Sequence, residues 1–253
     1  MKPQFVFLFI LLQSFFSYAQ FGNNPNLMQA LNAAYNLRTA ETAVVKNTVF
    51  NRLKVKYALQ DLDEFLSIAQ DNLFILKLFV NKYSDFTDKI NEIEKLYNTL
   101  RLIPLSPSKT SKIKSLVDLH NKFLININSL ILSINQSLKS EFSKQKLMIY
   151  NIAFYAQEFG YLFALENSGI ILDELNFNIK KEEKKTFNQL KLSVNELINN
   201  KQYLSYANVD ELKQLKSDID LLDKIIKNPS GNEFINTVYN LTNKISKRTK
   251  NLL

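Results

Sequence analysis

The stretch VKYALQDLDEFLSIAQDNLFILKLFVNKYSDFTDKINEIEKLYNTL, Val55 to Leu100, decides the fold of this protein. It lacks glycine and proline, and thirteen of fourteen positions spaced alternately three and four apart are apolar or tyrosine. This heptad pattern predicts one helix whose hydrophobic seam faces a partner helix. At about 1.5 Å per residue the predicted helix is roughly 68 Å long. The seam positions are Val55, Ala58, Leu62, Phe65, Ala69, Asn72, Leu76, Phe79, Tyr83, Phe86, Ile90, Ile93, Tyr97 and Leu100.

A second long helical stretch follows after a turn. Two prolines in PLSPSKT, Pro104 to Thr110, end the first helix. A short turn between two long seams predicts an antiparallel hairpin. Before the hairpin, Asn26 to Lys54 is compatible with a further helix that kinks within KNTVFN, Lys46 to Asn51. The second seam comprises Ile113, Leu116, His120, Phe123, Ile127, Leu130 and Ile134, then Ile149, Ile152, Ala156, Phe159 and Phe163.

Shorter helices are expected toward the carboxyl terminus. A glycine suits the left-handed cap at a helix end, and polar residues three apart suit a helix start. The expected boundaries are a cap at Gly169, a helix over Leu172–Asn199, and capping pairs at Asn208/Glu211 and Ser230/Glu233. The predicted fold is therefore all-α: an elongated antiparallel helical hairpin or coiled-coil bundle over residues 20–168, with the helices of residues 169–253 packing on it.

The amino terminus, MKPQFVFLFILLQSFFSYAQ, has the parts of a secretory signal peptide. Lys2 is followed by an unbroken apolar run from Phe5 to Leu12, and Ser17 and Ala19 suit a cleavage site. The apolar run is short for a retained anchor, which needs about 20 residues. We therefore predict that residues 1–19 are a cleaved signal peptide and that the protein is exported to the periplasm or the extracellular space.

The composition excludes several classes of protein. The chain has no cysteine and one histidine, so disulfides and zinc sites built from cysteine and histidine are excluded. The net charge of +8 comes mainly from lysine, without an arginine cluster. Nucleic acid is consequently disfavoured as a partner.

Enzyme signatures are missing from the chain. There is no G-x-S-x-G, no glycine-rich phosphate loop and no H-E-x-x-H motif. The single histidine, His120, occupies a seam position, where a core residue is the simpler interpretation than a catalyst. We predict a protein that is not an enzyme, and assign no catalytic, cofactor-binding or metal-binding residue.

The segment LMIYNIAFYAQEFGYLFAL, Leu147 to Leu165, is apolar on almost every side. A central charged residue, Glu158, opposes membrane insertion at a cost of about 2.5 to 3.5 kcal/mol. Burial among other helices is the favoured interpretation. Two alternatives remain: conditional membrane insertion, and an exposed docking surface for a partner or a membrane. The residues of that surface are Tyr150, Phe154, Tyr155 and Tyr161.

The tail NKISKRTKNLL, Asn243 to Leu253, gathers basic residues, and no acidic residue follows Glu233. One hypothesis is that it docks on an anionic partner or an anionic lipid surface. The alternative is a solvated helix end, where cations complement the helix dipole. The basic residues are Lys244, Lys247, Arg248 and Lys250.

Export, a long hairpin and missing enzyme motifs together suggest a non-enzymatic structural or interaction protein of a bacterial envelope. The layout of signal, long helical hairpin and small terminal helices resembles that of the periplasmic helical proteins of type IV secretion. This resemblance of layout implies a periplasmic component of a conjugation or type IV secretion apparatus, with protein partners in the envelope; a homo-oligomer stays open. The alternative is a secreted membrane-active, pore-forming-like protein that uses residues 147–165.

Overall fold

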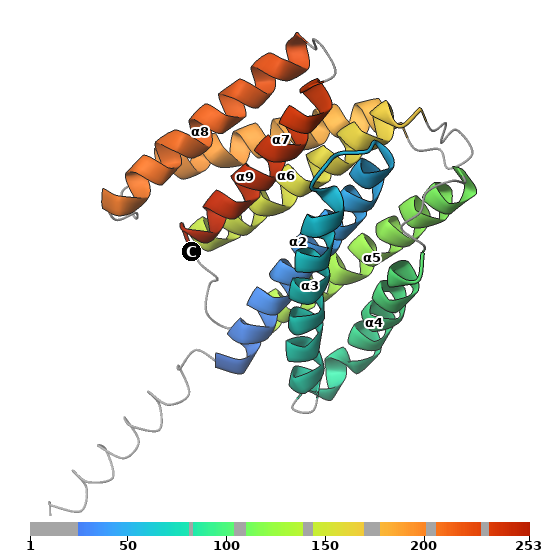
Figure 1. Cartoon of the computed structure of the whole chain (residues 1–253). Helices are drawn as coiled ribbons and strands as arrows, with labels where there is room; N and C mark the ends of the chain where they lie inside the picture. Colours follow the sequence, from blue (N-terminus) through green and yellow to red (C-terminus); the bar gives the residue numbers. More distant parts are fainter. Residues whose placement is uncertain are drawn as a thin grey trace, which may run out of the picture.

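The computed structural model describes residues 25–80, 83–103, 110–138, 144–169, 178–200, 206–228 and 233–253. Within these ranges every regular element is a helix, and the prediction of an all-α fold is confirmed (Figure 1). The predicted signal peptide, residues 1–19, lies outside the described residues. The elements are α2 (Pro25–Arg52), α3 (Ala58–Val80), the 3-10 turn η1 (Ser84–Phe86), α4 (Thr87–Arg101), α5 (Thr110–Ser137), α6 (Lys144–Asn167), α7 (Ile179–Asn199), α8 (Tyr206–Lys227) and α9 (Glu233–Lys250).

The long helix predicted over Val55–Leu100 is divided into two. α3 ends at Val80 and α4 begins at Thr87, so the prediction of one continuous helix is wrong. The aromatic rings of Phe79 and Tyr83 stack at 4.5 Å, and Phe79 also contacts Phe86 at 5.5 Å. The seam spacing continues through the break because Phe79 and Phe86 are both buried on the same core. Periodicity alone therefore could not reveal the turn.

α2 is the central helix of the molecule. Every residue from Ala40 to Phe50 is buried, because α3, α5 and α6 pack around this helix. The kink predicted within Lys46–Asn51 is wrong, since α2 is a continuous helix as far as Arg52. The chain turns only afterwards, where Lys54 adopts a left-handed φ of 60°.

The other helices are arranged around α2 in two groups. α4 packs on α5, while α6 contacts α2, α7 and α9 (Figure 1). α8 packs mainly on α9 and contacts α7 less extensively. One hydrophobic cluster joins the first half of α2 to α3, α4 and α5, and a second joins the other half of α2 to α6, α7, α8 and α9 and to one end of α3 and of α5. The two clusters therefore share α2, α3 and α5.

The helix boundaries test the predicted caps. Gly169 has a left-handed φ of 67°, as predicted for the end of α6. α8 begins at Tyr206, so Asn208 lies inside the helix and its prediction as a cap is wrong. Asn178 caps α7 instead, accepting a hydrogen bond from the Lys181 N–H at 2.9 Å. Ser230 lies outside the described residues.

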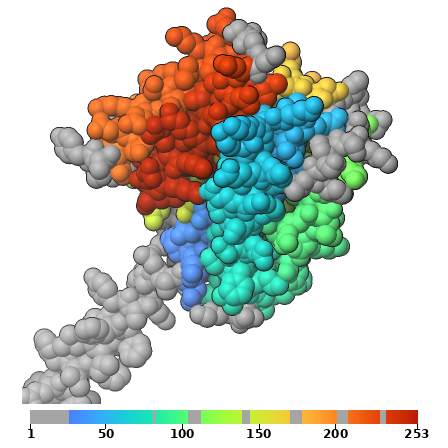
Figure 2. Space-filling view, in the orientation of Figure 1, coloured from blue at the N-terminus to red at the C-terminus, as the bar shows by residue number. Residues whose placement is uncertain are grey.

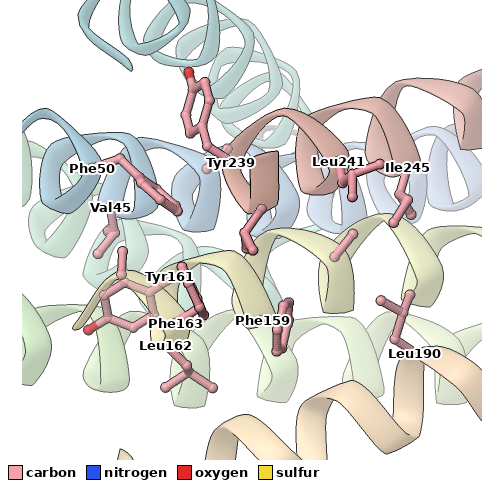
Figure 3. Close-up of a cluster of buried hydrophobic side chains, with 14 of the residues drawn as sticks. Val45, Phe50, Phe159, Tyr161, Leu162, Phe163, Leu190, Tyr239, Leu241 and Ile245 are labelled. Atoms are coloured by element: carbon pink, nitrogen blue, oxygen red, sulfur yellow. The ribbon is translucent and has the colours of Figure 1, made fainter. Parts of the chain in front are cut away.

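The apolar segment of residues 147–165 belongs to α6 and lies in the core, which confirms the favoured interpretation (Figure 3). It is surrounded by α2, α7 and α9, so its apolar residues find neighbours on almost every side. Among the described helices, none has both the length and the apolar character needed to cross a membrane. Figure 3 shows Phe159, Tyr161, Leu162 and Phe163 of α6 with Val45, Phe50, Leu190, Tyr239, Leu241 and Ile245.

Candidate functional site

Three of the four aromatic residues predicted as a docking surface are buried. Tyr150, Phe154 and Tyr161 lie in the core, and Tyr155 is half-buried. The Tyr150 ring stacks on Tyr35 at 4.9 Å. These rings do not form an exposed surface, because α2 covers this side of α6.

Phe154 lies against a buried cation. The Arg38 guanidinium lies 4.2 Å from the centre of the Phe154 ring. Its Nη1 and Nη2 atoms donate hydrogen bonds to Asn128 at 3.1 Å and Asn151 at 2.9 Å. The aromatic residue therefore helps to solvate a charge inside the bundle, which is a structural role.

His120 is the centre of a buried ionic cluster. Its Nδ1 lies 3.0 Å from a carboxylate oxygen of Glu41, and its Nε2 lies 3.1 Å from Glu158. Burial alone would lower the pKa of His120, but the two carboxylates outweigh it and raise the pKa to about 10. Burial also raises the pKa of Glu41, but with a carboxylate at each ring nitrogen the geometry favours a protonated His120, which ties α5 to α2 and α6.

This cluster is not arranged as a metal site. Both ring nitrogens of a protonated histidine are donors, so neither can ligate a cation. In the parts of the chain that the structure describes, no group of three or more His, Cys, Asp or Glu side chains could hold a metal ion. The sequence interpretation of His120 as a core residue is confirmed, but its carboxylate partners lie 79 and 38 positions away and left no local signal.

A polar groove of about 650 Å³ lies between the start of α3 and one face of α9. Figure 2 shows the red surface of α9 directly beside the cyan surface at the start of α3. We call it the α3–α9 groove. Three of the four predicted basic residues, Lys244, Lys247 and Arg248, line it, whereas Lys250 does not. The other lining residues are Tyr57, Gln60, Asp61, Asn240, Asn243 and Asn251.

The floor of the α3–α9 groove is a buried hydrogen-bond network. Asp61 Oδ2 accepts hydrogen bonds from the Tyr239 hydroxyl at 2.5 Å and from Asn243 Nδ2 at 2.9 Å. Beneath them, the fully buried Lys46 of α2 donates to Asn243 Oδ1. Burial lowers the pKa of Lys46 to about 7, although the charge of Asp61 opposes the shift. The central helix therefore holds the floor of the groove in place.

The basic wall of the groove is paired with acids of the same chain. Asp218 accepts hydrogen bonds at 2.7 Å from both Lys244 and Arg248 Nε. Arg248 Nη1 also donates to Glu211 at 2.7 Å. Lys247 lies 3.7 Å from Glu64. The predicted electrostatic tail is thus largely neutralised.

The tail is also an integral part of the bundle. Ile245, Thr249 and Leu252 are buried, so the last residues of α9 contribute to packing. Lys250 is exposed and has no ion-pair partner among the described residues. A tail that contributes to the core cannot act as a freely docking segment.

The arrangement suits hydrogen-bonded binding rather than covalent chemistry. Lys46, whose pKa is lowered by burial, is sealed beneath the floor with its Nζ hydrogen-bonded to Asn243. The sequence did contain a signal for this face of α9. Polar residues at positions 240, 243, 244, 247 and 251 repeat at helical spacing. What it lacked was any indication that the start of α3 faces them.

Comparisons with protein-family models, with curated proteins and with solved structures found no match to this chain.

Proposed function

We propose that this protein is an exported, non-enzymatic helical interaction protein of a bacterial envelope that binds an envelope component in the α3–α9 groove. The observation that carries the proposal is the groove itself, with its lining of amides, charged groups and one tyrosine. Its floor is fixed by the contacts of Asp61, Tyr239, Asn243 and Lys46. A surface held by buried hydrogen bonds is pre-organised, which lowers the entropic cost of binding.

The burial of α6 favours this proposal over the membrane-active alternative. Insertion of residues 147–165 would require α6 to leave α2, α7 and α9. It would also remove Glu158 from the protonated imidazole of His120. Breaking a buried ion pair by separating one partner costs about 3 to 5 kcal/mol.

A finer proposal is a role as a periplasmic component of a conjugation or type IV secretion apparatus. It is supported by the predicted signal peptide and by the resemblance of the sequence layout to those components, and an all-helical fold is compatible with it. Crosslinking to a component of such an apparatus would support it, and crosslinking only to other envelope components would contradict it.

Site-specific photo-crosslinking in cells of the organism that encodes the protein tests the main proposal. Benzoylphenylalanine replaces Gln60 or Asn240 in the groove, and Gln136, exposed on α5, is the matched control. The reagent inserts into C–H bonds of proteins and sugars alike. We expect a discrete adduct in the envelope fraction from both groove positions and none from the control. No adduct from the groove, or a protein retained in the cytoplasm with residues 1–19 attached, would overturn the proposal.

A further inference from the structure

We infer that the α3–α9 groove binds a neutral carbohydrate chain; this inference rests on the proposed function and specifies its ligand. The first argument is charge. Three cations of α9 are each paired with a carboxylate of the same chain. The cations are Lys244, Lys247 and Arg248, their acids are Glu64, Glu211 and Asp218, and Asp61 adds a fourth carboxylate to the groove. A site whose carboxylates are at least as many as its cations exerts no strong attraction on an anionic ligand.

The arginine in the wall is already engaged. Phosphate and carboxylate ligands are commonly held by two parallel N–H groups of one arginine. The Nε and Nη1 atoms of Arg248 already donate to Asp218 and Glu211. An anion could reach only the remaining Nη hydrogens, with the carboxylates of Asp218 and Glu211 beside it, so the groove disfavours phosphorylated and acidic ligands.

The remaining hydrogen-bonding groups match hydroxyls. The side chains of Gln60 and Asn240 line the groove and make no hydrogen bond to another described residue. Each carboxamide offers two N–H donors and a carbonyl acceptor. Asp61 contributes a carboxylate whose Oδ1 has no hydrogen-bond partner among the described residues. Because each sugar hydroxyl both donates and accepts, donors and acceptors side by side fit a polyol better than a ligand of one polarity.

Tyr57 adds a ring to this polar set. It lies in the turn before α3, lines the groove and is 49 % exposed. A tyrosine gives an apolar face and a polar hydroxyl at low entropic cost. The apolar C–H face of a pyranose ring can stack on such a face while its hydroxyls reach the amides.

The shape of the groove favours a chain over a single sugar. Sites for small molecules bury about 70 to 90 % of the ligand surface. The α3–α9 groove is instead largely open to solvent. An open groove contacts one side of several successive residues, which suits an oligosaccharide or polysaccharide.

Binding of defined oligosaccharides to the purified protein tests the inference. The neutral probes are cellohexaose, maltohexaose and the hexamer of N-acetylglucosamine; the anionic probes are polyglutamate and phosphatidylglycerol vesicles. We expect at least one neutral hexamer to bind, with a Kd that changes less than about twofold between low and physiological salt, because uncharged contacts are not screened. Tyr57→Ala and Asn240→Ala should each weaken binding about tenfold, equivalent to about 1.4 kcal/mol.

The matched control is Gln136→Ala on α5, which should bind as the wild type does. Tyr57 and Asn240 are exposed, so their variants should keep the wild-type melting temperature. Binding of no neutral hexamer, or binding confined to the anionic probes and lost with salt, would overturn the inference. If groove crosslinks persist in cells in that case, the proposed function stands and only the carbohydrate inference falls. If the crosslinks are absent as well, both fall.

Discussion

Lys46 and His120 are both fully buried, and their surroundings shift the two pKa values in opposite directions. The pKa of His120 rises from 6.5 to about 10, so its contribution to stability is complete below pH 6.5 and is lost as the pH rises toward 10. The pKa of Lys46 falls from 10.5 to about 7. Between these two pH values the unfolded chain binds a proton that the folded chain lacks, so the free energy of unfolding rises as the pH rises. The two effects oppose one another.

We expect Lys46→Met to make the effect of His120 titration visible in the pH dependence of the free energy of unfolding. In the wild-type protein the free energy of unfolding should change little between about pH 8 and 10, because one proton is gained and one is lost on unfolding. In the variant it should fall by about 1.4 kcal/mol per pH unit, since only the His120 proton is released. Urea unfolding at several pH values measures the slope.

Lys56→Met on the surface is the control and should keep the flat profile. Glu41 and Glu158 face His120, and Asp61 and Lys247 influence Lys46, and none of these is changed in either variant. A flat profile for Lys46→Met would show that the two groups do not oppose one another.

Gly160 lies where α6 comes closest to α2 and α9. A Cβ atom there would lie 2.8 Å from Lys46 Cδ and 2.9 Å from Thr242 Oγ1. Helix propensity alone favours Gly→Ala by about 1 kcal/mol. We nevertheless expect Gly160→Ala to lower the free energy of unfolding by about 1 to 3 kcal/mol, because both neighbours are buried and cannot move aside. Urea unfolding gives the sign, and a more stable variant would contradict the close packing.

At the scale of the element, a substitution in α4 tests whether the hydrophobic seam of α3 continues after the chain passes into α4. Ile90 is fully buried among residues of α3 and α5. Ile90→Asp should lower the free energy of unfolding by about 3 kcal/mol or more, because an unpaired carboxylate would be buried. Asn91→Asp adds the same charge one position along on the exposed face and should change stability by less than about 0.5 kcal/mol. Equal melting temperatures for the two variants would mean that α4 does not pack through Ile90.

The hydrophobic periodicity predicted the helices well but not their interruptions. Seam residues such as Leu76, Phe79, Ile90 and Ile93 are buried as predicted. The turn before α4 was missed because its aromatic residues keep the seam spacing. The centrality of α2 was missed for a different reason. Its buried face carries residues such as Lys46, whose partners lie far away in the sequence.

Only part of the candidate site could be predicted from the sequence. The basic residues of α9 were identified from their local density, and three of them line the groove. Their acidic partners on α8 and the facing residues of α3 could not be identified, because no local pattern records which helices will meet. Charge density alone therefore suggested an anionic ligand, whereas the paired charges favour a neutral one.

At the scale of the whole molecule, α8 is the least extensively packed of the described α-helices. It packs mainly on α9, and Asp218 links the two helices through Lys244 and Arg248. Elements with fewer packed neighbours open at lower free energy than the rest of a fold. We therefore expect the amides of α8 to exchange hydrogen faster than those of α2.

Asp218→Asn should accelerate exchange in α8 further and lower its opening free energy by about 1 to 3 kcal/mol, because one of its two hydrogen bonds is lost and the other loses the carboxylate charge. Asp210→Asn is the control, since Asp210 is 77 % exposed and pairs only with Lys213 of the same helix. Hydrogen exchange followed by mass spectrometry reports both helices in one experiment. Similar amide exchange rates for α8 in the two variants would show that Asp218 does not stabilise the packing of α8 on α9.

The enclosure of α2 sets the order in which the protein can fold. Lys46 meets its partner Asn243 across 197 positions of the chain, and a ribosome adding 5 to 20 residues per second needs roughly 10 to 40 s to cover that distance. During this interval the charged groups of α2 stay in water, because the helices that will solvate them do not yet exist. The innermost helix is thus among the first to be synthesised and the last to be enclosed.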